Sequence, residues 1–138
     1  MKKILFLDDE LERVYPYVTL LNSKFGNYTI LPLEDPNDAK DYFQQNHDFI
    51  ALCICDIMFG TSAKHEYSGI EGGIEFYDNI KTLYPSIPFI ILTNRKLPVL
   101  KKFTELIRSH NDVAIEKILI PPIELIKIVK KILSHETI

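Results

Sequence analysis

Short apolar stretches alternate with longer amphipathic stretches along the whole chain. The apolar stretches have the length of β-strands, and the amphipathic stretches repeat apolar residues at helical spacing. The pattern predicts strands at five places, namely Lys3–Leu7, Tyr28–Leu33, Phe49–Cys55, Pro88–Leu92 and Val113–Glu116. It predicts five helices, which begin near Tyr15, Pro36, Gly73, Leu97 and Pro122 and end near Gly26, Asn46, Tyr84, His110 and Ser134. Each strand is thus followed by a helix.

This strict alternation predicts an α/β fold built on a parallel sheet. The stretch Phe49–Cys55 is continuously apolar, which is typical of a central strand that is covered on both faces. A length of 138 residues fits one domain, and a five-stranded, doubly wound sheet of the flavodoxin-like type fits that length. We therefore expect a (βα)5 fold with three α/β/α layers, forming a single domain over residues 1–138 with no output domain attached.

Local signals predict where helices begin and which residues they bury. Pro16 indicates a helix start near Tyr15, because proline is tolerated in a first helical turn but not deeper. Asp35 and Pro36 form a good cap and first-turn pair. The stretch Phe59–Glu71 has no convincing period, so we expect a long loop there. The last helix is expected to bury one apolar stripe, made of Ile123, Ile126, Val129, Ile132 and Leu133.

Composition narrows the class of protein. The chain carries 16 basic and 19 acidic residues, a formal net charge of −3. This balance argues against direct nucleic-acid binding, which requires a basic face. The apolar runs are far shorter than a membrane span, and Ile4–Leu7 is too short for the core of a signal peptide. We therefore expect a cytoplasmic protein without membrane insertion. We interpret Cys53 and Cys55 as small buried thiols of a core strand rather than as a metal or redox pair.

Residues with reactive or charged side chains follow four of the predicted strands. Asp8, Asp9 and Glu10 follow the first strand, Asp56 the third, Thr93 the fourth and Lys117 the fifth. In open parallel sheets, ligands bind at the carboxyl ends of the strands, so these side chains are expected to converge. Clustered carboxylates repel one another unless a cation compensates, and oxygen ligands favour Mg²⁺.

The chemistry of these groups suggests phosphoryl transfer. The carboxylate of Asp56 could attack phosphorus and form an acyl phosphate, with Mg²⁺ and Lys117 screening the charge. The hydroxyl of Thr93 could donate a hydrogen bond to a phosphoryl oxygen. Each residue alone has a simpler interpretation: helix capping for the acidic residues, a structural hydroxyl for Thr93 and a surface charge for Lys117. Their joint placement at four strand ends favours one site.

The same residues resemble a known family over nearly the whole chain. The chain resembles the receiver domain of bacterial two-component response regulators, the CheY-like superfamily. The matching segments are Ile4–Glu10, Leu52–Met58, Gly73–Phe76, Pro88–Thr93 and Lys117. Each segment alone is weak evidence for the family. Together, in this order and at these strand ends, the segments form a specific match.

The resemblance implies a role for each site residue. Asp56 would accept a phosphoryl group from a histidine kinase or a phosphotransfer protein. Asp9, Asp56 and the backbone carbonyl of Met58 would bind Mg²⁺, with Asp8 assisting through water. Thr93 and Lys117 would hold the phosphoryl group. Phosphorylation would bias a two-state surface around the fourth helix, the fifth strand and the fifth helix, where an unidentified protein target would bind. A receiver of this kind is not an enzyme beyond its own phosphorylation and dephosphorylation.

The sequence departs from the family pattern around the switch. Gly73 is the nearest match to a glycine that normally follows the phosphoacceptor more closely, so the intervening loop is longer than usual. Lys117 is followed by Ile118 instead of the usual proline, and Ala114 stands where many receivers have an aromatic residue. Asn94 replaces the usual small residue after Thr93 and is expected to slow the access of water to the acyl phosphate.

Three functions remain open at this stage. The first is a stand-alone, phosphorylatable receiver that signals through protein contacts, with a weak homodimer through the fourth and fifth helices as a further option. The second is a degenerate receiver that acts as a phosphorylation-independent interaction module, which Ala114 and the altered Lys117 loop favour. The third is a small Mg²⁺-dependent hydrolase or nucleotide-binding enzyme, against which the absence of any phosphate-loop or nucleophile-elbow motif counts.

Overall fold

A computed structural model describes residues 2–56, 59, 70–93, 101–116 and 121–136. These residues form one parallel sheet of five strands in the order β2-β1-β3-β4-β5. The strands are β1 (Lys3–Leu7), β2 (Thr29–Leu33), β3 (Ile50–Asp56), β4 (Phe89–Thr93) and β5 (Val113–Glu116). The helices are α1 (Leu11–Lys24), α2 (Pro36–Asn46), α3 (Ile70–Leu83), α4 (Lys101–Ser109) and α5 (Pro122–Glu136).

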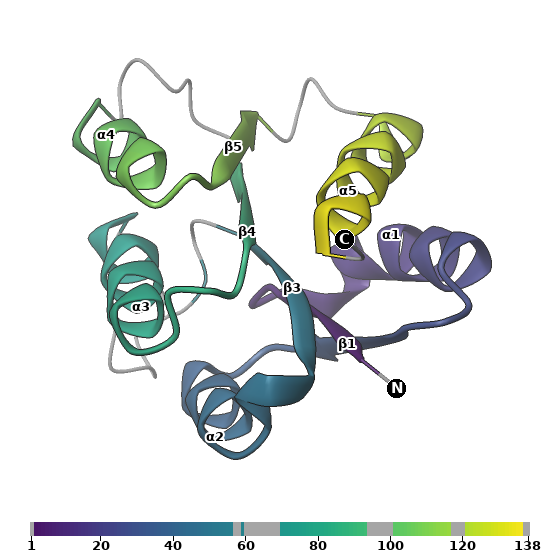
Figure 1. The fold of residues 1–138 in the computed structure, drawn as a ribbon, viewed down its shortest axis with the longest axis horizontal. Helices are drawn as coiled ribbons and strands as arrows, with labels where there is room; N and C mark the ends of the chain where they lie inside the picture. Colours follow the sequence, from purple (N-terminus) through teal and green to yellow (C-terminus); the bar gives the residue numbers. More distant parts are fainter. Residues whose placement is uncertain (1, 57–58, 60–69, 94–100, 117–120, 137–138) are drawn as a thin grey trace.

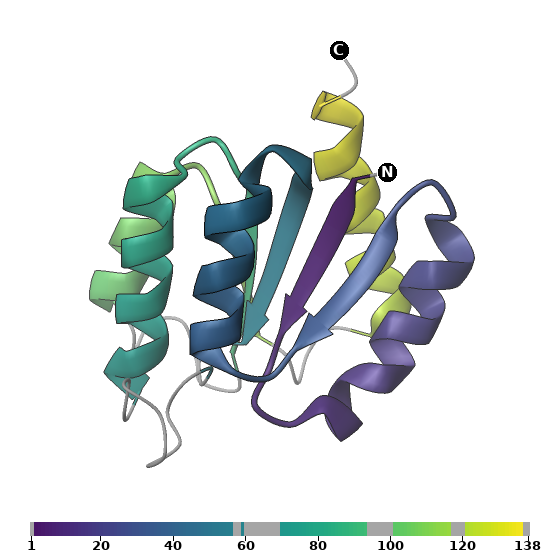
Figure 2. The ribbon, with the colours of Figure 1, turned by 90° about the horizontal axis from the view of Figure 1, so that it is seen from below.

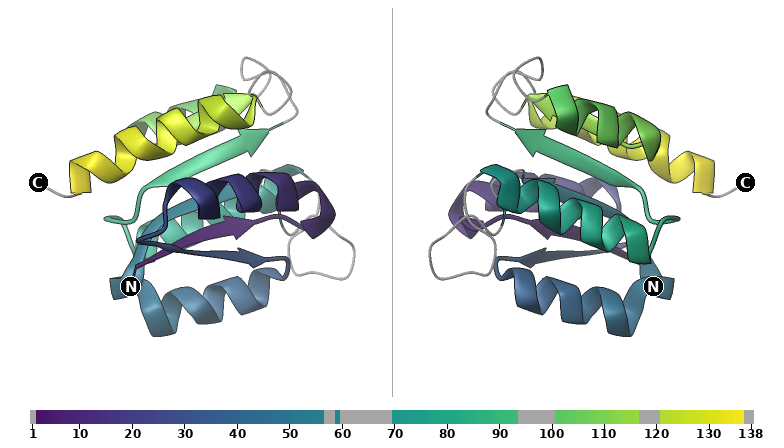
Figure 3. Two further views of the ribbon diagram at one scale, coloured as in Figure 1. Left: turned by 90° about the vertical axis from the view of Figure 1, so that its right-hand side faces the viewer. Right: turned by 90° about the vertical axis from the view of Figure 1, so that its left-hand side faces the viewer.

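The helices cover both faces of the sheet. Helices α1 and α5 lie side by side on one face, and α2, α3 and α4 lie on the other (Figure 1). Figure 3 shows the two faces from opposite sides. The predicted flavodoxin-like, three-layer (βα)5 fold is therefore confirmed. Among the described residues, none of the helices combines the length and the apolar character that crossing a membrane requires.

Each face of the sheet has its own hydrophobic core, because successive residues of a strand point to opposite faces. Ile4 and Phe6 of β1 pack in the core beneath α1 and α5. Leu5 and Leu7 pack in the core beneath α2, α3 and α4. Every residue of β3 is buried, as expected for a strand covered on both faces. Because the two cores clamp β1 and β3, the carboxyl ends of these strands have fixed positions.

Cys53 and Cys55 confirm the interpretation drawn from their spacing. Both lie on β3, both are buried in the core beneath α2, α3 and α4, and both are free thiols. Phe49, in contrast, does not belong to the strand. It ends a short 3-10 turn, His47–Phe49, and its side chain is 57% exposed. The strand prediction was wrong at this residue, because an apolar run does not show where a turn interrupts it.

The predicted start of the first helix was also wrong. Helix α1 begins at Leu11, so that Pro16 lies in its second turn. Proline there lacks the N–H that would bond the carbonyl of Glu12, at a cost of about 3 kcal/mol in a helix interior. Pro16 is exposed, so water can reach the freed carbonyl, and the preceding turn contributes Val14 to the core with 1% of its surface exposed. We infer that burial of Val14 offsets the cost of the proline.

The ends of other helices agree with prediction to different degrees. Asp35 caps α2 as expected, because its Oδ1 accepts a hydrogen bond of 2.8 Å from the N–H of Asn37. Helix α3 begins three residues before the predicted Gly73. In α5, Val129 and Leu133 are buried as predicted, but Ile123 is 63% exposed and Leu125 takes its place in the core. Leu125, Val129 and Leu133 follow the i, i+4, i+8 spacing of one helical face. The predicted start of the fourth helix near Leu97 lies outside the described residues.

Candidate functional site

The carboxyl ends of all five strands lie at one edge of the sheet. The arrowheads of β1, β2 and β3 point toward this edge in Figure 2. The chain order makes β1 and β3 the central neighbours, with β2 on one side and β4 and β5 on the other. The direction of winding therefore reverses between β1 and β3, and in doubly wound sheets ligands bind at that reversal. We call the ends of β1, β3 and β4 the carboxylate edge.

Asp8 directly follows β1 and is only 5% exposed. Its backbone N–H donates to the carbonyl of Leu33 at 3.2 Å, which continues the pairing of β1 with β2 by one residue. Its side-chain Oδ1 accepts a hydrogen bond of 2.8 Å from the N–H of Glu10. This local bond turns the chain away from the sheet toward α1. The structure therefore holds the Asp8 carboxylate in a fixed, nearly buried position.

Asp56 is the last residue of β3 and is also 5% exposed. Its carbonyl accepts a hydrogen bond of 2.9 Å from the N–H of Phe59. The Phe59 side chain is fully buried and packs edge-to-face on Phe76 of α3, with ring centroids 5.0 Å apart. Phe59 thus anchors the chain just beyond Asp56 in the core. The loop predicted for Phe59–Glu71 was too long at its carboxyl end, since α3 begins at Ile70. Phe59 itself lies in a turn, and residues 60–69 lie outside the described part.

The negative charges of Asp8, Asp9 and Asp56 all affect the pKa of one buried thiol, that of Cys55. Cys55 belongs to β3, which lies between β1 and β4, and burial raises the pKa of its thiol well above the usual value. Nearby Cys53 raises the pKa of Cys55 further, and so do the charges of Asp56, Asp8 and Asp9. The charges of all three carboxylates therefore act on Cys55, although Asp9 is only half-buried. Asp8 and Asp56 stand at adjacent strand ends, and the convergence of all the predicted site side chains stays a prediction.

The remaining predicted residues are described in part. Thr93 closes β4, where it pairs with Glu116 of β5, while Asp56 pairs with Leu92. The backbone of Thr93 thus lies one residue beyond the level of Asp56 on the neighbouring strand. Met58 and Lys117 lie outside the described residues, and so does the side-chain position of Thr93. Ala114, at the position of the usual aromatic, is half-buried against the core beneath α2, α3 and α4.

The carboxylate edge offers oxygen atoms, the type of ligand that a hard divalent cation binds. Carboxylate oxygens are the ligands that Mg²⁺ prefers, and two of these carboxylates are almost fully buried at adjacent strand ends. Within the described part of the chain, no group of three or more His, Cys, Asp or Glu side chains is arranged so that it could hold a metal ion. The ligand set that the resemblance implies also includes the backbone carbonyl of Met58, which lies outside the described residues.

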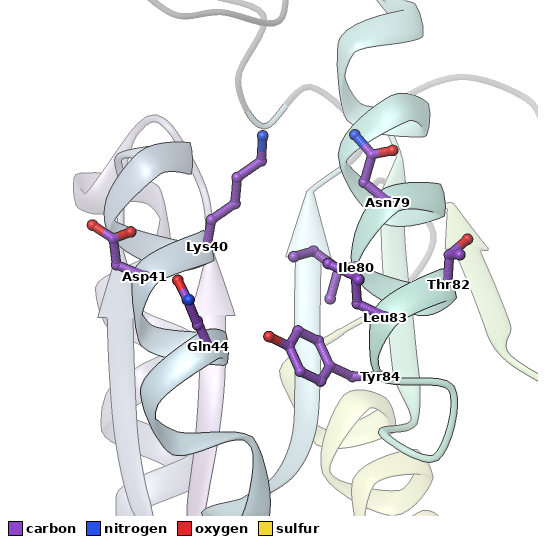
Figure 4. Close-up of a pocket in the computed structure, with 8 residues that line it drawn as sticks. All are labelled: Lys40, Asp41, Gln44, Asn79, Ile80, Thr82, Leu83 and Tyr84. Carbon is purple, nitrogen blue, oxygen red and sulfur yellow. The ribbon is translucent and has the colours of Figure 1, made fainter.

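A surface hollow of about 690 Å³ lies elsewhere, between α2 and α3. It is lined by residues such as Lys40 and Gln44 of α2 and Leu83 of α3, and the ring of Tyr84 points toward α2 (Figure 4). None of the aspartates of the carboxylate edge lines it. The hollow is therefore separate from the candidate site.

Two buried charged residues were missed by the sequence interpretation. Lys81 of α3 is 2% exposed, and its Nζ lies 3.1 Å from Oδ1 of Asp112, which precedes β5. A signal for Lys81 existed in the sequence: it follows Ile74 and Tyr77 at helical spacing on the apolar face of α3. A charged residue at such a position is costly unless it is paired.

Comparison with known proteins supports the fold. No protein-family model matches the sequence, and no curated protein matches it. Many solved structures of receiver domains do match the fold. A response regulator receiver domain protein from Clostridium thermocellum has a TM-score of 0.75 and 18% identity, with 99% of this chain and 98% of that chain covered. The N-terminal domain of a response regulator/sensory box/GGDEF 3-domain protein from Carboxydothermus hydrogenoformans has a TM-score of 0.72 and 21% identity, with 99% and 97% covered.

A CheY-like receiver domain protein from Methanospirillum hungatei JF-1 is equally similar, with a TM-score of 0.72, 18% identity and coverage of 99% and 97%. At such identities the similarity establishes the fold. The chain is thus a doubly wound α/β protein with the fold of response-regulator receiver domains. The family resemblance seen in the sequence motifs is confirmed at this level.

Proposed function

We propose that this chain is a response-regulator receiver in the cytoplasm, phosphorylated on Asp56. The observation that carries the proposal is the position of two nearly buried acidic residues, Asp8 and Asp56, at adjacent strand ends of a receiver fold. Both lie where the winding of the sheet reverses, which is the expected ligand position in such folds. Asp9 adds a third carboxylate, whose charge reaches Cys55 together with theirs.

The proposed reaction transfers a phosphoryl group from the phosphohistidine of a histidine kinase or phosphotransfer protein. A carboxylate oxygen of Asp56 forms a bond to phosphorus while the bond between phosphorus and the histidine nitrogen breaks. The imidazole of the donor leaves with the electron pair, and Asp56 becomes an acyl phosphate. Core packing around β3 fixes Asp56, so that little orientational freedom is lost on the way to the transition state.

The other residues of the proposed site would bind Mg²⁺ or contact the phosphoryl group. Asp9, Asp56 and the carbonyl of Met58 would hold Mg²⁺, with Asp8 acting through water. When bound, Mg²⁺ supplies the positive charge that offsets the carboxylates and the phosphoryl oxygens. The hydroxyl of Thr93 and the ammonium group of Lys117 would contact the phosphoryl oxygens. Thr93 stands opposite Glu116, so a change at Thr93 acts directly on the β4–β5 pair. We propose that α4, β5 and α5 carry this change to a protein target.

Intact-mass spectrometry after incubation with acetyl phosphate and Mg²⁺ tests the proposal. We expect one added phosphoryl group on the parent chain and none on Asp56→Asn or in the presence of a chelator. Asp41→Asn, at an exposed carboxylate of α2, is the matched control and should be phosphorylated like the parent. A parent chain that takes up no phosphoryl group would favour the competing function, a degenerate receiver that binds partners without phosphorylation.

A further inference from the structure

A buried polar cluster lies at the opposite end of β5 from the carboxylate edge. It consists of Tyr77 and Lys81 of α3 and of Asp112, which immediately precedes β5, and we call it the Asp112 cluster. The side chains of Lys81 and Asp112 are only 3% and 1% exposed. Burying two charges is costly even when they are paired, so the arrangement calls for an explanation beyond general stability.

The Asp112 carboxylate joins α3 to the start of β4. Its Oδ1 accepts hydrogen bonds from the backbone N–H of Phe89 at 2.9 Å and from Nζ of Lys81 at 3.1 Å. Its Oδ2 accepts a hydrogen bond from the hydroxyl of Tyr77. Lys81 also donates to the carbonyl of Ile87 at 2.6 Å. Within the described residues no buried side-chain nitrogen or oxygen lacks a partner, so the cluster is fully satisfied.

The backbone of Asp112 is held just as firmly by the end of α4. Its N–H donates to the carbonyl of Ile107 at 3.1 Å, and the N–H of Asn111 donates to the carbonyl of Arg108 at 3.1 Å. Asn111 has a φ of 60°, the left-handed conformation that ends helices in this hydrogen-bond pattern. Asp112 is therefore the junction of α3, α4, β4 and β5.

The hydrogen bond from the N–H of Phe89 to the Asp112 carboxylate lies at the amino end of the β4–β5 pair. Ile90 pairs with Val113, so Phe89 and Asp112 face each other one residue before the paired region. The Asp112 side chain accepts the N–H of Phe89 there and closes the amino end of the β4–β5 ladder. Strand β5 has four residues and lies at the edge of the sheet, where only β4 pairs with it. Few backbone hydrogen bonds therefore hold β5 in place, so one further bond at its amino end adds a large share of what fixes its register.

We propose that Asp112 fixes the register of β5 against β4 and is thereby a positioning residue for the carboxylate edge. The observed register places Glu116 opposite Thr93, at the end from which the chain continues to Lys117. A slip by one residue would shift that end by about 3.3 Å and turn every side chain of β5 to the other face. The consequence for phosphorylation rests on the proposed function, whereas the register itself does not.

Two multiple variants separate register from stability. Both carry Tyr77→Phe and Lys81→Met, which remove the hydroxyl and the buried positive charge. One adds Asp112→Asn, which keeps a side-chain oxygen to accept the N–H of Phe89. The other adds Asp112→Leu, which has the same branching at Cγ and no acceptor. Cross-strand nuclear Overhauser effects between Ile90 and Val113 and between Thr93 and Glu116 report the register in each variant.

We expect the asparagine variant to keep the register of the parent and the leucine variant to lose it or to populate two registers. Because a displacement of about 1 Å can slow a reaction about 100-fold, phosphorylation by acetyl phosphate should slow to that extent only in the leucine variant. Mg²⁺ affinity should be equal in both, since its proposed ligands lie on β1, β3 and the segment after β3. The same register and the same phosphorylation rate in both variants would overturn the proposal.

A measurement on the parent chain covers the case in which a variant does not fold. The amide of Phe89 should exchange its hydrogen as slowly as the amides of the β4–β5 ladder; exchange at the rate of an open turn would contradict the proposal. If the parent chain takes up no phosphoryl group, the proposed function fails, while the Overhauser effects and the hydrogen exchange still decide the role of Asp112.

Discussion

At the scale of single residues, the carboxylate edge concentrates negative charge in a nearly buried place. Asp8 and Asp56 are each 5% exposed, and Asp9 is half-buried beside them. Like charges held close together in a region of low dielectric constant disfavour the folded state. A bound cation relieves that cost, so removal of one carboxylate should weaken metal binding and strengthen the metal-free fold.

Asp8→Asn tests this trade-off. Asparagine can still accept the N–H of Glu10, so the local turn survives. We expect Mg²⁺ affinity, measured by isothermal titration calorimetry, to fall about 10- to 100-fold, as is typical when a supporting metal partner is lost. The midpoint of thermal unfolding without metal should rise. Glu34→Gln, at an exposed residue after β2, is the control and should change neither quantity. Unchanged Mg²⁺ affinity in Asp8→Asn would contradict its assigned role.

Cys53 gives a second residue-scale prediction, this time for pH. Burial raises the pKa of its thiol well above the usual value of 9.0, and the charge of Asp112 adds to this, while Lys81 opposes it. Above pH 9 the unfolded chain releases the thiol proton and the folded chain keeps it. The free energy of unfolding should therefore be unaffected by this thiol below pH 9 and should decrease above it, by up to about 1.4 kcal/mol per pH unit.

Urea unfolding in the presence of a reductant, at several pH values between 8 and 10.5, measures this slope. Cys53→Ala should show a smaller decrease above pH 9 than the parent, because one titrating thiol is missing. Equal slopes for the two proteins would show that the thiol of Cys53 ionises in the folded chain as it does in the unfolded chain.

At the scale of secondary-structure elements, α1 shows how packing overrides a local preference. Its proline lies in the second turn, where it interrupts the hydrogen bonding of the helix, yet the helix starts before it. The turn that precedes Pro16 carries Val14 into the core beneath α1 and α5. Pro16 therefore weakens the hydrogen bonding of α1, and the burial of Val14 keeps the first turn of the helix packed on the core next to the carboxylate edge.

Pro16→Ala should stabilise the protein. Alanine restores the missing N–H and removes the ring, while it raises the entropy of the unfolded chain, for a net gain of about 1–2 kcal/mol. Pro36→Ala is the matched control, since Pro36 occupies the first position of α2, where proline is well suited, and its replacement should bring no gain. Chemical unfolding measures both. A loss of stability in Pro16→Ala would mean that α1 is adapted to its proline.

At the scale of the whole molecule, the order of elements could be predicted and several of their details could not. Strand and helix alternate with clear apolar periods, so the sheet, its layers and the clustering of Asp8 and Asp56 followed from the sequence. Phe49 and Ile123 were assigned to buried positions from local pattern alone, whereas both are exposed. Lys81 and Asp112 escaped notice, because 31 positions separate the partners and only the folded chain brings them together.

The distribution of exposed apolar residues predicts where a phosphodonor docks. Tyr15 and Ile123 are 54% and 63% exposed, and they lie near the amino-terminal ends of α1 and α5, next to the carboxylate edge. In the proposed function a donor histidine has to reach Asp56 at this edge, and aromatic residues such as Tyr15 are enriched in protein interfaces. Leu83 is 67% exposed at the end of α3, which is the end far from that edge.

Tyr15→Ala should therefore slow transfer from a phosphorylated histidine kinase and leave transfer from acetyl phosphate unchanged. Leu83→Ala, the matched control, should affect neither reaction. The donor is the kinase that phosphorylates the parent chain fastest in a purified panel, and radiolabelled transfer measures the rates. If Tyr15→Ala and the parent accept phosphate from that kinase at the same rate, the donor does not dock on this rim.

The central claim is that Asp56 itself becomes an acyl phosphate, and chemical trapping tests it most directly. The parent chain is incubated with acetyl phosphate and Mg²⁺ and then treated with borohydride, which reduces an aspartyl phosphate to homoserine. Proteolysis and tandem mass spectrometry then locate the reduced residue. We predict homoserine at position 56, with unchanged aspartate at positions 8 and 9. Unmodified aspartate at position 56, or homoserine at another carboxylate, would contradict the claim.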